Sequence, residues 1–408
     1  MICGLLGAKL GHSYSPKIHQ LLGNKSYSLF EKAPEELESF LLYGNFTGLN
    51  VTIPYKQTVI PFCAELSPTA RKLGAVNTIV RREDGTLIGH NTDYFGFETM
   101  LRRSNLNVSG KKVLVLGTGG ASRTVTAVLQ EHGAQVVTVS RTGEDNYGNL
   151  HRHSDAAVIV NTTPVGMYPD TEAAPLSLTI FPRLEGVLDV IYNPACTKLL
   201  QDAKERGLVA VNGLLMLVAQ AKESAEWFMQ QEIPDNKIDE IYRQLRMQME
   251  NIVLIGMPGC GKSTVGALLA EKTGKQFVDA DALIAKKAGC SIPEIFATRG
   301  EMEFRDLESA ALADLGKQSG LIIATGGGCV TRPENKAFLK RNGRIFCLHR
   351  SLELLSTNGR PRSQSTPLDV LYRQRKSLYE SFADYHIDNN RPPQDTASEI
   401  LHIWEEIL

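Results

Sequence analysis

The 408-residue sequence lacks several features that mark specialised classes of protein. No apolar run approaches the roughly 20 residues that a membrane-spanning helix needs. There is no low-complexity tract, no Gly/Ser-rich linker and no repeat with a period of about 20–50 residues. Neither sign of charge is in excess, since 44 Lys and Arg against 45 Asp and Glu leave a net charge of −1. This balance argues against binding to nucleic acid or to a membrane surface through bulk positive charge, so we expect neither partner.

Cysteine is present without the arrangement of a disulfide framework or a zinc motif. The seven cysteines are odd in number and include no C-x-x-C pair: Cys3, Cys63, Cys196, Cys260, Cys290, Cys329 and Cys347. Such usage is typical of free thiols in a reducing compartment. The first residues, MICGLLGAKLG, also lack the basic segment and cleavage site of a signal peptide. We therefore expect a cytoplasmic protein.

What the sequence does contain is a regular alternation of strand-like and helix-like segments. Short runs rich in Val, Ile and Leu recur along nearly the whole chain, with Gly and Pro at the loops between them. This alternation predicts an α/β fold with parallel sheets. The strands are expected at residues 2–6, 48–53, 113–117, 135–139, 157–161, 187–191, 252–256, 321–325 and 344–348.

The length and one change of pattern predict the domain organisation. At roughly 150 residues per domain, a chain of this length makes two or three domains. The polar segment PDNKIDEIYRQLRMQME has apolar residues at helical spacing from Ile238 to Leu245 and runs directly into NIVLIG, a new buried-strand pattern. We therefore predict one domain at 1–248 and a second at 250–408.

The second domain begins with a phosphate-binding motif. GMPGCGKST follows the expected strand and fits G-x-x-x-x-G-K-[ST], in which glycines let backbone N–H groups converge on phosphate oxygens. The lysine of such a loop binds the β- and γ-phosphates of ATP or GTP, and the serine hydroxyl binds Mg²⁺. The predicted phosphate-binding residues are Gly256, Gly259, Cys260, Gly261, Lys262, Ser263 and Thr264.

Polar residues and bare backbone follow this motif. FVDADALI ends a strand with Asp279 and Asp281, two carboxylates expected on the same side of the strand end, where one suits a metal-bound water and the other a diol. IIATGGG ends another strand in three glycines, against which a small ligand can lie. Arg305, Arg360 and Arg375 suit a carboxylate substrate and a transferring phosphoryl group. Each arginine alone would more often be a solvated surface residue.

In this order the motifs resemble the shikimate kinase family over essentially all of 251–408. The resemblance implies a P-loop NTPase-type α/β domain in which the 3-hydroxyl of shikimate attacks the γ-phosphate of ATP. It places Asp279 beside Mg²⁺ and Arg360 on a lid over the phosphates. It implies Lys262 and Asp281 as catalytic residues, and it implies shikimate-binding positions at Asp281, Arg305, Gly327, Gly328 and Arg375.

The first domain carries a different nucleotide motif. KKVLVLGTGGASRTVTAVL predicts a strand, a Gly-rich turn and a helix, with binding residues at Gly117, Gly119, Gly120, Ala121 and Ser122. An NAD-binding fold places Asp or Glu after the next strand to bind the ribose hydroxyls. Here Ser140, Arg141 and Thr142 take that place, and an arginine can pair with a 2′-phosphate, so the sequence favours NADP. The alternative is that Arg141 is an exposed loop residue.

Segments outside this turn carry polar residues that a dinucleotide fold does not need. They are Ser13 and Ser15 in LGHSYSPKIH, Thr52 and Lys56 in GLNVTIPYK, Asn77 in GAVNTI, and Asp93 in GHNTDYFGF. Singly, such a lysine is more often a solvated charge, and such an aspartate could be the N-cap of a helix over 94–103. As a set, with NTTPVGM, DVIYNP and VNGLLMLVAQA downstream, they resemble the shikimate dehydrogenase family over about 1–248.

This second resemblance implies a two-lobed dehydrogenase. A Rossmann-type NADP lobe would span about 101–213, and a substrate lobe would combine about 1–100 with 214–248. Hydride from NADPH would reach the 3-keto carbon of 3-dehydroshikimate while Lys56 and Asp93 serve the developing alkoxide, and the sequence leaves open which of the two transfers the proton. Gly213 would lie beside the cofactor. The implied substrate-binding residues are Ser13, Ser15, Thr52, Lys56, Asn77, Asp93, Tyr192 and Gln220, of which Tyr192 could equally be a packing residue.

Together the two resemblances predict a bifunctional enzyme that makes shikimate with NADPH and phosphorylates it with ATP and Mg²⁺. Its partners would be the small molecules 3-dehydroshikimate and shikimate, and nothing in the sequence indicates an oligomeric state. Two alternatives stay open. The first half could act on a related substrate such as quinate, or one half could be catalytically silent, since Arg362 stands in the kinase lid where an apolar residue is common in the family.

Overall fold

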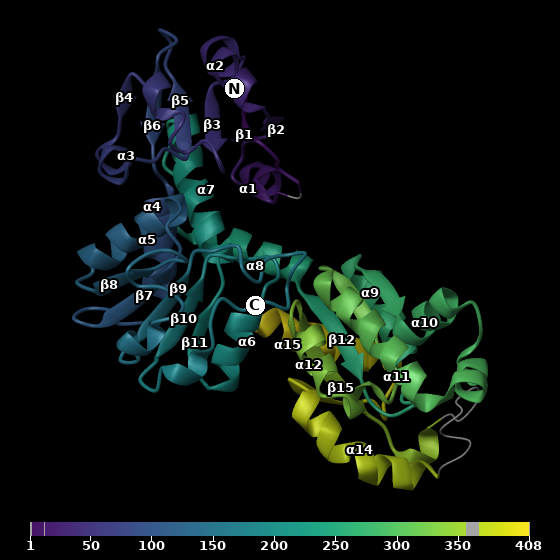
Figure 1. The fold of residues 1–408 in the computed structure, drawn as a ribbon. Coiled ribbons are helices and arrows are strands. Elements are labelled where there is room, and N and C mark those ends of the chain that lie inside the picture. The colour runs from purple at the N-terminus through teal and green to yellow at the C-terminus, as the bar shows by residue number, and fades with distance from the viewer. Residues whose placement is uncertain (1, 12, 356–366, 408) are drawn as a thin grey trace. The chain divides into compact units, whose positions relative to one another are not determined.

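The computed structural model describes residues 2–11, 13–355 and 367–407. The chain forms two compact units (Figure 1). The first comprises Met1–Asn193 and Thr197–Tyr242, and the second comprises Pro194–Cys196 and Arg243–Leu408. The division falls inside α8 (Asn236–Met249), the helix expected at the end of the first domain. Within the described ranges, no helix is both long enough and apolar enough to cross a membrane.

The first unit begins with a six-stranded sheet. In spatial order its strands are β2 (Tyr27–Glu31), β1 (Cys3–Gly7), β3 (Gly48–Val51), β5 (Thr78–Arg81), β6 (Leu87–His90) and β4 (Glu65–Leu66). β1 pairs in parallel with β2 and β3, whereas β5 runs antiparallel to β3 and β6. The expected parallel α/β pattern therefore carries one antiparallel hairpin, whose turn places Gly85 at φ +85°. The helices between these strands are α1 (Ser15–Leu21), α2 (Pro34–Tyr43) and α3 (Pro68–Leu73).

The second sheet of this unit is parallel throughout. Its spatial order is β11 (Val209–Val211), β10 (Gly186–Asp189), β9 (Val158–Asn161), β7 (Lys112–Leu116) and β8 (Gln135–Val139). β9 and β10 are buried along their whole length, which explains their continuous apolar runs. The accompanying helices are α4 (Asp93–Arg103), α5 (Gly120–Glu131), α6 (Lys198–Glu205) and α7 (Leu214–Met229).

Helices α4 and α7 approach each other closely because α4 has a glycine at the contact. A Cβ atom on Gly96 would lie 2.7 Å from the carbonyl oxygen of Met216 and 2.9 Å from Cβ of Gln220. A larger residue would push the helices apart. This contact fixes the first residue of α4, Asp93, relative to Gln220 on α7.

The second unit is built on a five-stranded parallel sheet. Its spatial order is β13 (Gln276–Asp279), β14 (Leu321–Ala324), β12 (Asn251–Ile255), β15 (Gly343–His349) and β16 (Tyr385–Asp388). The central strand β12 is buried along its whole length. The helices are α9 (Lys262–Thr273), α10 (Ala280–Ala288), α11 (Ile292–Lys317), α12 (Glu334–Lys340), α14 (Leu368–Phe382) and α15 (Pro393–Glu406). In such a sheet, ligands bind beyond the carboxyl ends of the strands, which is where the phosphate-binding motif lies.

Candidate active sites

A lysine and an aspartate meet in the first unit. Lys56 lies in the segment after β3, and its Nζ donates a hydrogen bond to Oδ2 of Asp93 at 2.5 Å. Their side chains are only 20% and 10% exposed, so the two charges interact more strongly than an ion pair on the surface would. Thr92 is the N-cap of α4 and Asp93 is its first helical residue, so the alternative that Asp93 is merely the N-cap is wrong.

Buried amides and hydroxyls adjoin this pair. Asn77 Nδ2 donates to Thr92 Oγ1 at 3.0 Å and to Gln220 Oε1 at 3.5 Å, while Thr92 N donates to Asn77 Oδ1 at 2.7 Å. The structure thus brings the predicted Asn77 and Gln220 next to Asp93. Thr92 also belongs to this network and was missed, although it stands in the same GHNTDYFGF motif that identified Asp93.

The serines and Tyr192 form a second group. The backbone N–H of Ser15 donates to Oγ of Ser13 at 3.2 Å, and Ser15 is buried at the start of α1. Between them, Tyr14 packs edge-on against Tyr192, with ring centroids 6.1 Å apart. Burial raises the pKa of both phenols. Thr52 lies near the end of β1, where a Cβ on Gly7 would come within 2.8 Å of its methyl group. Among the described residues, no hydrogen bond links Ser13, Ser15 or Thr52 to the Lys56–Asp93 pair.

The Gly-rich turn between β7 and α5 lies beside the Lys56–Asp93 pair. Gly117 has φ +108°, and Ser122 Oγ donates to the Gly117 carbonyl at 2.7 Å, so the serine at the third glycine position closes the turn. Gly119 is the N-cap of α5, and a Cβ there would meet no atom within 4 Å. A Cβ on Gly120 would lie 3.7 Å from Cδ of Lys56. The open backbone suits a pyrophosphate at the start of α5.

The remaining predicted cofactor residues have different surroundings. Arg141 and Thr142 are exposed and lie beyond the end of β8. This exposure fits both interpretations of Arg141, as a ligand of the 2′-phosphate and as an ordinary surface residue. Ser140 Oγ accepts a hydrogen bond from Gly143 N at 2.8 Å and so shapes this loop. Gly213 is required by packing, since a Cβ there would lie 2.0 Å from the carbonyl oxygen of Val190. Ala121 is the second residue of α5.

A buried carboxylate supports the turn that carries Tyr192. Asp189 ends β10, where Oδ1 accepts hydrogen bonds from Asn161 Nδ2 (3.0 Å) and Ile191 N (3.1 Å), and Oδ2 accepts one from Thr197 Oγ1 (2.7 Å). Its side chain is fully buried, and this burial raises the pKa from 3.8 to about 6.

This raised pKa predicts a pH-dependent effect of Asp189→Asn. The folded state binds the extra proton more tightly than the unfolded chain, so the contribution of Asp189 to stability is greatest below about pH 4 and is lost as pH rises through about 6. Asparagine does not titrate. The free energy of unfolding of the variant, relative to wild type, should therefore rise by up to about 3 kcal/mol between pH 4 and pH 7, at 1.36 kcal/mol per unit. Urea unfolding at both pH values measures this. The exposed Asp170→Asn is the control, and an equal change in both variants would contradict the prediction.

The phosphate-binding motif joins β12 to α9. Gly256, Gly259 and Gly261 all have φ between +83° and +140°, a region that favours glycine. Lys262 is buried, and its Nζ donates to the carbonyl oxygens of Gly256 (2.9 Å) and Met257 (3.1 Å). The predicted Cys260 is also buried, whereas Thr264 is exposed on α9.

The two residues predicted at Mg²⁺ lie together. Ser263 Oγ donates a hydrogen bond to Oδ2 of Asp279 at 2.6 Å. Hydroxyl and carboxylate oxygens are the ligands that Mg²⁺ prefers. The placement of Asp281 corrects the sequence prediction, because β13 ends at Asp279 and Asp281 lies in α10. The reason is that Oδ1 of Asp279 accepts hydrogen bonds from the N–H groups of Asp281 and Ala282 and so starts the helix.

The triple glycine lies among the predicted shikimate-binding residues. A Cβ on Gly326 would come within 2.7 Å of Oδ1 of Asp281, and a Cβ on Gly328 within 2.2 Å of Nη2 of Arg305. Nη1 of Arg375 donates to the carbonyl oxygen of Gly327 at 3.0 Å. The structure thus brings Asp281, both arginines and the glycines together at one place. Arg360 lies outside the described residues.

An acidic residue behind this group was not predicted to take part. Glu308 is fully buried, and its Oε2 accepts a hydrogen bond from Nη1 of Arg305 at 2.6 Å. Burial raises the pKa of Glu308, and the adjacent Arg305 opposes this rise. Arg305 and Glu308 are three residues apart on one helix, a spacing that places two side chains on the same face. This spacing could have predicted the pair from the sequence.

The fold and the two sites define a class: a two-lobed nucleotide-dependent oxidoreductase followed by a P-loop kinase. Comparison with known proteins gives the families. Residues 5–79 match the family described as the shikimate dehydrogenase substrate binding domain, and residues 258–405 match the family described as shikimate kinase. The shikimate dehydrogenase (NADP(+)) of Clostridium perfringens (strain 13 / Type A) is 37% identical over 266 residues, which cover 60% of this chain and 97% of that protein.

Two solved structures are similar to the same part of the chain. A chorismate mutase/shikimate 5-dehydrogenase fusion protein from Clostridium acetobutylicum has 38% identity and a TM-score of 0.56, covering 60% of this chain and 96% of that one. Shikimate 5-dehydrogenase from Thermus thermophilus, in complex with NADP(H) and shikimate, has 32% identity and a TM-score of 0.55, covering 60% and 99%. The chain belongs to the shikimate dehydrogenase family and carries a shikimate kinase domain after it. Both predicted resemblances and the predicted fold class are confirmed.

Proposed function

We propose that the chain reduces 3-dehydroshikimate to shikimate with NADPH and then phosphorylates the 3-hydroxyl of shikimate with ATP and Mg²⁺. The observation that carries this proposal is that one chain holds two separate polar sites, each beside its own Gly-rich nucleotide loop. The families that match the two parts act on the same small molecule, so the product of the first site is the substrate of the second.

In the first site, NADPH supplies the hydride, and the chain's own residues serve the oxygen that gains negative charge. We assign Lys56 to stabilise this oxygen and Asp93 to orient Lys56 and bind the neighbouring hydroxyl. Because Nζ and Oδ2 are 2.5 Å apart, we expect the two groups to act as a unit. The amides of Asn77 and Gln220, with the Thr92 hydroxyl, would bind ring hydroxyls. Ser13 and Ser15 would hold the carboxylate, with Thr52 and Tyr192 beside the ring.

In the second site, ATP supplies the phosphoryl group. We assign Lys262 to the β- and γ-phosphates, where it would exchange two backbone carbonyls for phosphate oxygens. Ser263 and Asp279 would hold Mg²⁺, the latter through water. Asp281 would bind and orient the attacking hydroxyl. Arg305, Arg375 and the backbone of Gly327 and Gly328 would bind the rest of shikimate, and Arg360 would close over the phosphates.

A coupled assay tests the bifunctional proposal. The full chain, given 3-dehydroshikimate, NADPH and Mg-ATP, should form shikimate 3-phosphate, with one NADPH oxidised for each phosphate ester formed. Accumulation of shikimate without its phosphate would identify a silent kinase half, and no oxidation of NADPH would identify a silent reductase half. Faster turnover of quinate with NAD than of shikimate with NADP would favour the alternative substrate.

The assignment of NADP to Arg141 gives a second prediction. Arg141→Ala should raise the KM for NADPH by about 10-fold or more, because a hydrogen bond between charged groups contributes about 1.5 kcal/mol or more, and 1.4 kcal/mol is tenfold. The KM for NADH should not change, since NADH has no 2′-phosphate. Steady-state kinetics with both cofactors measures this. Arg152→Ala, at another exposed arginine of the same lobe, is the control. An equal loss for both cofactors would contradict the assignment.

We also propose the domain limits 1–248 and 250–408, with the NADP lobe at about 101–213 and the substrate lobe at about 1–100 and 214–248. The five-stranded sheet from β7 to β11 supports the limits of the NADP lobe.

We propose a cytoplasmic location. The seven cysteines support it, because all of them lie in the described residues and none forms a disulfide. The balanced charge supports the absence of nucleic-acid and membrane partners.

A further inference from the structure

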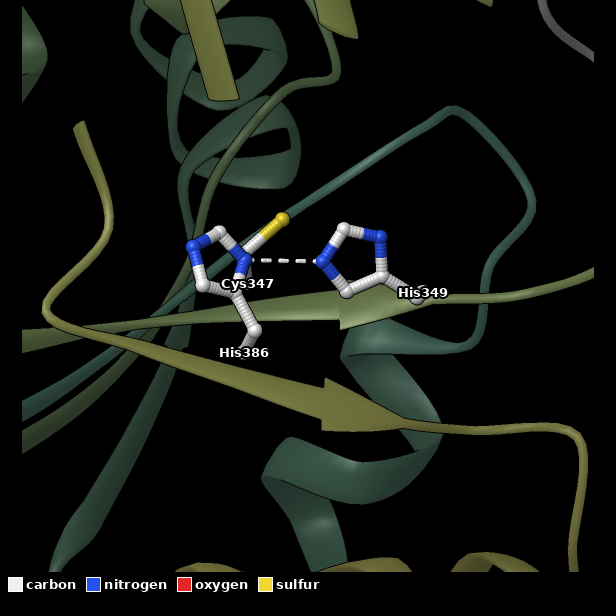
Figure 2. Close-up of side chains that lie close together, drawn as sticks. All are labelled: Cys347, His349 and His386. Atoms are coloured by element: carbon white, nitrogen blue, oxygen red, sulfur yellow. Dashed lines mark hydrogen bonds between the residues drawn. The ribbon is translucent and has the colours of Figure 1, made fainter. Parts of the chain in front are cut away.

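Three potential metal ligands converge on two neighbouring strands of the second unit. Cys347 and His349 lie two residues apart on β15, and His386 lies on β16. Cys347 pairs directly with His386 in the parallel register of these strands. Because side chains alternate along a strand, residues 347 and 349 point to the same face, and the register adds His386 to it. Figure 2 shows the two imidazoles side by side, with the cysteine sulfur next to them.

The ligand atoms are close enough to share one ion. Sγ of Cys347 and one ring nitrogen of each histidine all lie within 4.8 Å of one another, and Nε2 of His349 is 2.8 Å from Nδ1 of His386. Two ligands of a tetrahedral Zn²⁺, with bonds of about 2.0–2.3 Å, are about 3.5 Å apart. The two histidine nitrogens would therefore move apart by about 0.7 Å, and a pair of ligand atoms at the upper limit of separation would move together by about 1.3 Å. His386 is exposed, so its side chain has room to make this adjustment.

The surroundings of the group allow an ion to enter. Cys347 and His349 line a cavity of about 230 Å³, together with Gly256 and Met257 of the phosphate-binding loop. Neutral imidazole nitrogens and a thiolate are the ligand forms that bind Zn²⁺. Binding through Cys347 therefore releases the thiol proton.

We propose that Cys347, His349 and His386 form a binding site for one Zn²⁺ ion, with the fourth tetrahedral position open to the cavity. A thiolate with two imidazoles is a soft donor set that selects zinc over Mg²⁺, which prefers oxygen ligands. The site is thus distinct from Ser263 and Asp279, the oxygen donors assigned to Mg²⁺. It differs from sequence-recognisable zinc motifs, because its ligands come as C-x-H from one strand and a histidine 37 residues beyond His349 from another.

Zinc titration of the full chain tests this proposal. The reduced, metal-free protein, without nucleotide, should take up one Zn²⁺ per chain in competition with a chromophoric chelator. His386→Gln should weaken Zn²⁺ binding by about 100-fold or more, because even changes outside the ligand sphere cost about 10- to 100-fold. His402→Gln, at an exposed histidine outside the cluster, is the matched control and should bind as wild type does. Equal affinity in wild type and His386→Gln would overturn the proposal.

Cobalt substitution provides a test of the cysteine ligand. The Co²⁺ complex of the wild-type chain should show a thiolate-to-cobalt charge-transfer band in the near ultraviolet. Cys347→Ser should lose this band, while Cys290→Ser, at a free cysteine outside the cluster, should keep it. Survival of the band in Cys347→Ser would show that another thiol binds the metal and would overturn the assignment. Because Cys347 is buried, near-ultraviolet circular dichroism checks that its variant folds, and the exposed His386 variant keeps the proposal testable if it does not.

Discussion

Lys262→Ala is expected to abolish the phosphorylation of shikimate and to leave the reduction of 3-dehydroshikimate intact. The lysine is buried within the phosphate-binding loop, and its ammonium group is held by two backbone carbonyls. In the role proposed for it, Lys262 places a positive charge on the β- and γ-phosphates. This interaction strengthens as negative charge develops during phosphoryl transfer, and the alanine variant lacks it. Single groups of this kind contribute about 10³-fold to kcat. We expect a loss of at least about that size.

The reductase activity of the same preparation serves as an internal control. Both activities are measured on one sample, so a loss confined to the kinase cannot result from a difference in protein concentration. Lys272→Ala, at an exposed lysine further along the same helix, should retain both activities. Because the alanine variant leaves two carbonyls without their donor, thermal unfolding should be recorded with the kinetics. Persistent phosphoryl transfer by a folded variant would contradict the role of the loop.

Lys56→Ala is expected to lower the kcat of the reductase by about 10³-fold, because it removes the cation that we assign to the oxygen that gains charge. Asp93→Asn should lower kcat as well, since asparagine can still contact Lys56 but cannot hold it by charge. The two residues contact each other at 2.5 Å and are expected to act as one unit. Their double variant should therefore lose little more activity than Lys56→Ala alone.

A double-mutant cycle measures this coupling. The kcat values of wild type, both single variants and the double variant give the interaction free energy, and independent residues would give additive losses. Additivity would mean that Asp93 acts on the substrate without acting on Lys56. Lys25→Ala, at an exposed lysine of the same lobe, is the control, and shikimate phosphorylation should be the same in all five proteins.

The repeated pattern of the sequence predicted most of the sheets. Each of the nine expected strand segments overlaps a strand, because buried parallel strands have continuous apolar runs. Short or partly exposed strands were harder to recognise. β11 has only three residues and β16 has one fully buried residue, so neither forms an apolar run long enough to be recognised. The β5–β6 hairpin lay between longer signals, although its Asp-Gly turn was visible in the sequence.

The sequence identified individual residues of the two sites but did not show which of them contact one another. Motifs identified Lys56 and Asp93, but their meeting across 37 residues depends on how β3 and α4 are placed. Asp281 was expected on a strand because alternating residues share a face, whereas the side chain of Asp279 starts a helix there instead. Glu308 was not predicted to take part, because only the packing shows that it is fully buried against Arg305.

Gly96 of α4 also has a consequence for the temperature at which the reductase loses activity. Asp93 and Gln220 are held by two packed helices, and the absence of a side chain at Gly96 sets the thickness of the layer between them. Their separation is therefore a property of the packed interior, which changes abruptly when packing is lost and little before that. The fraction of enzyme that is active should then stay constant up to the temperature at which this unit melts, and fall together with the folded fraction. One added methyl group at position 96 would bring the onset of inactivation to a lower temperature.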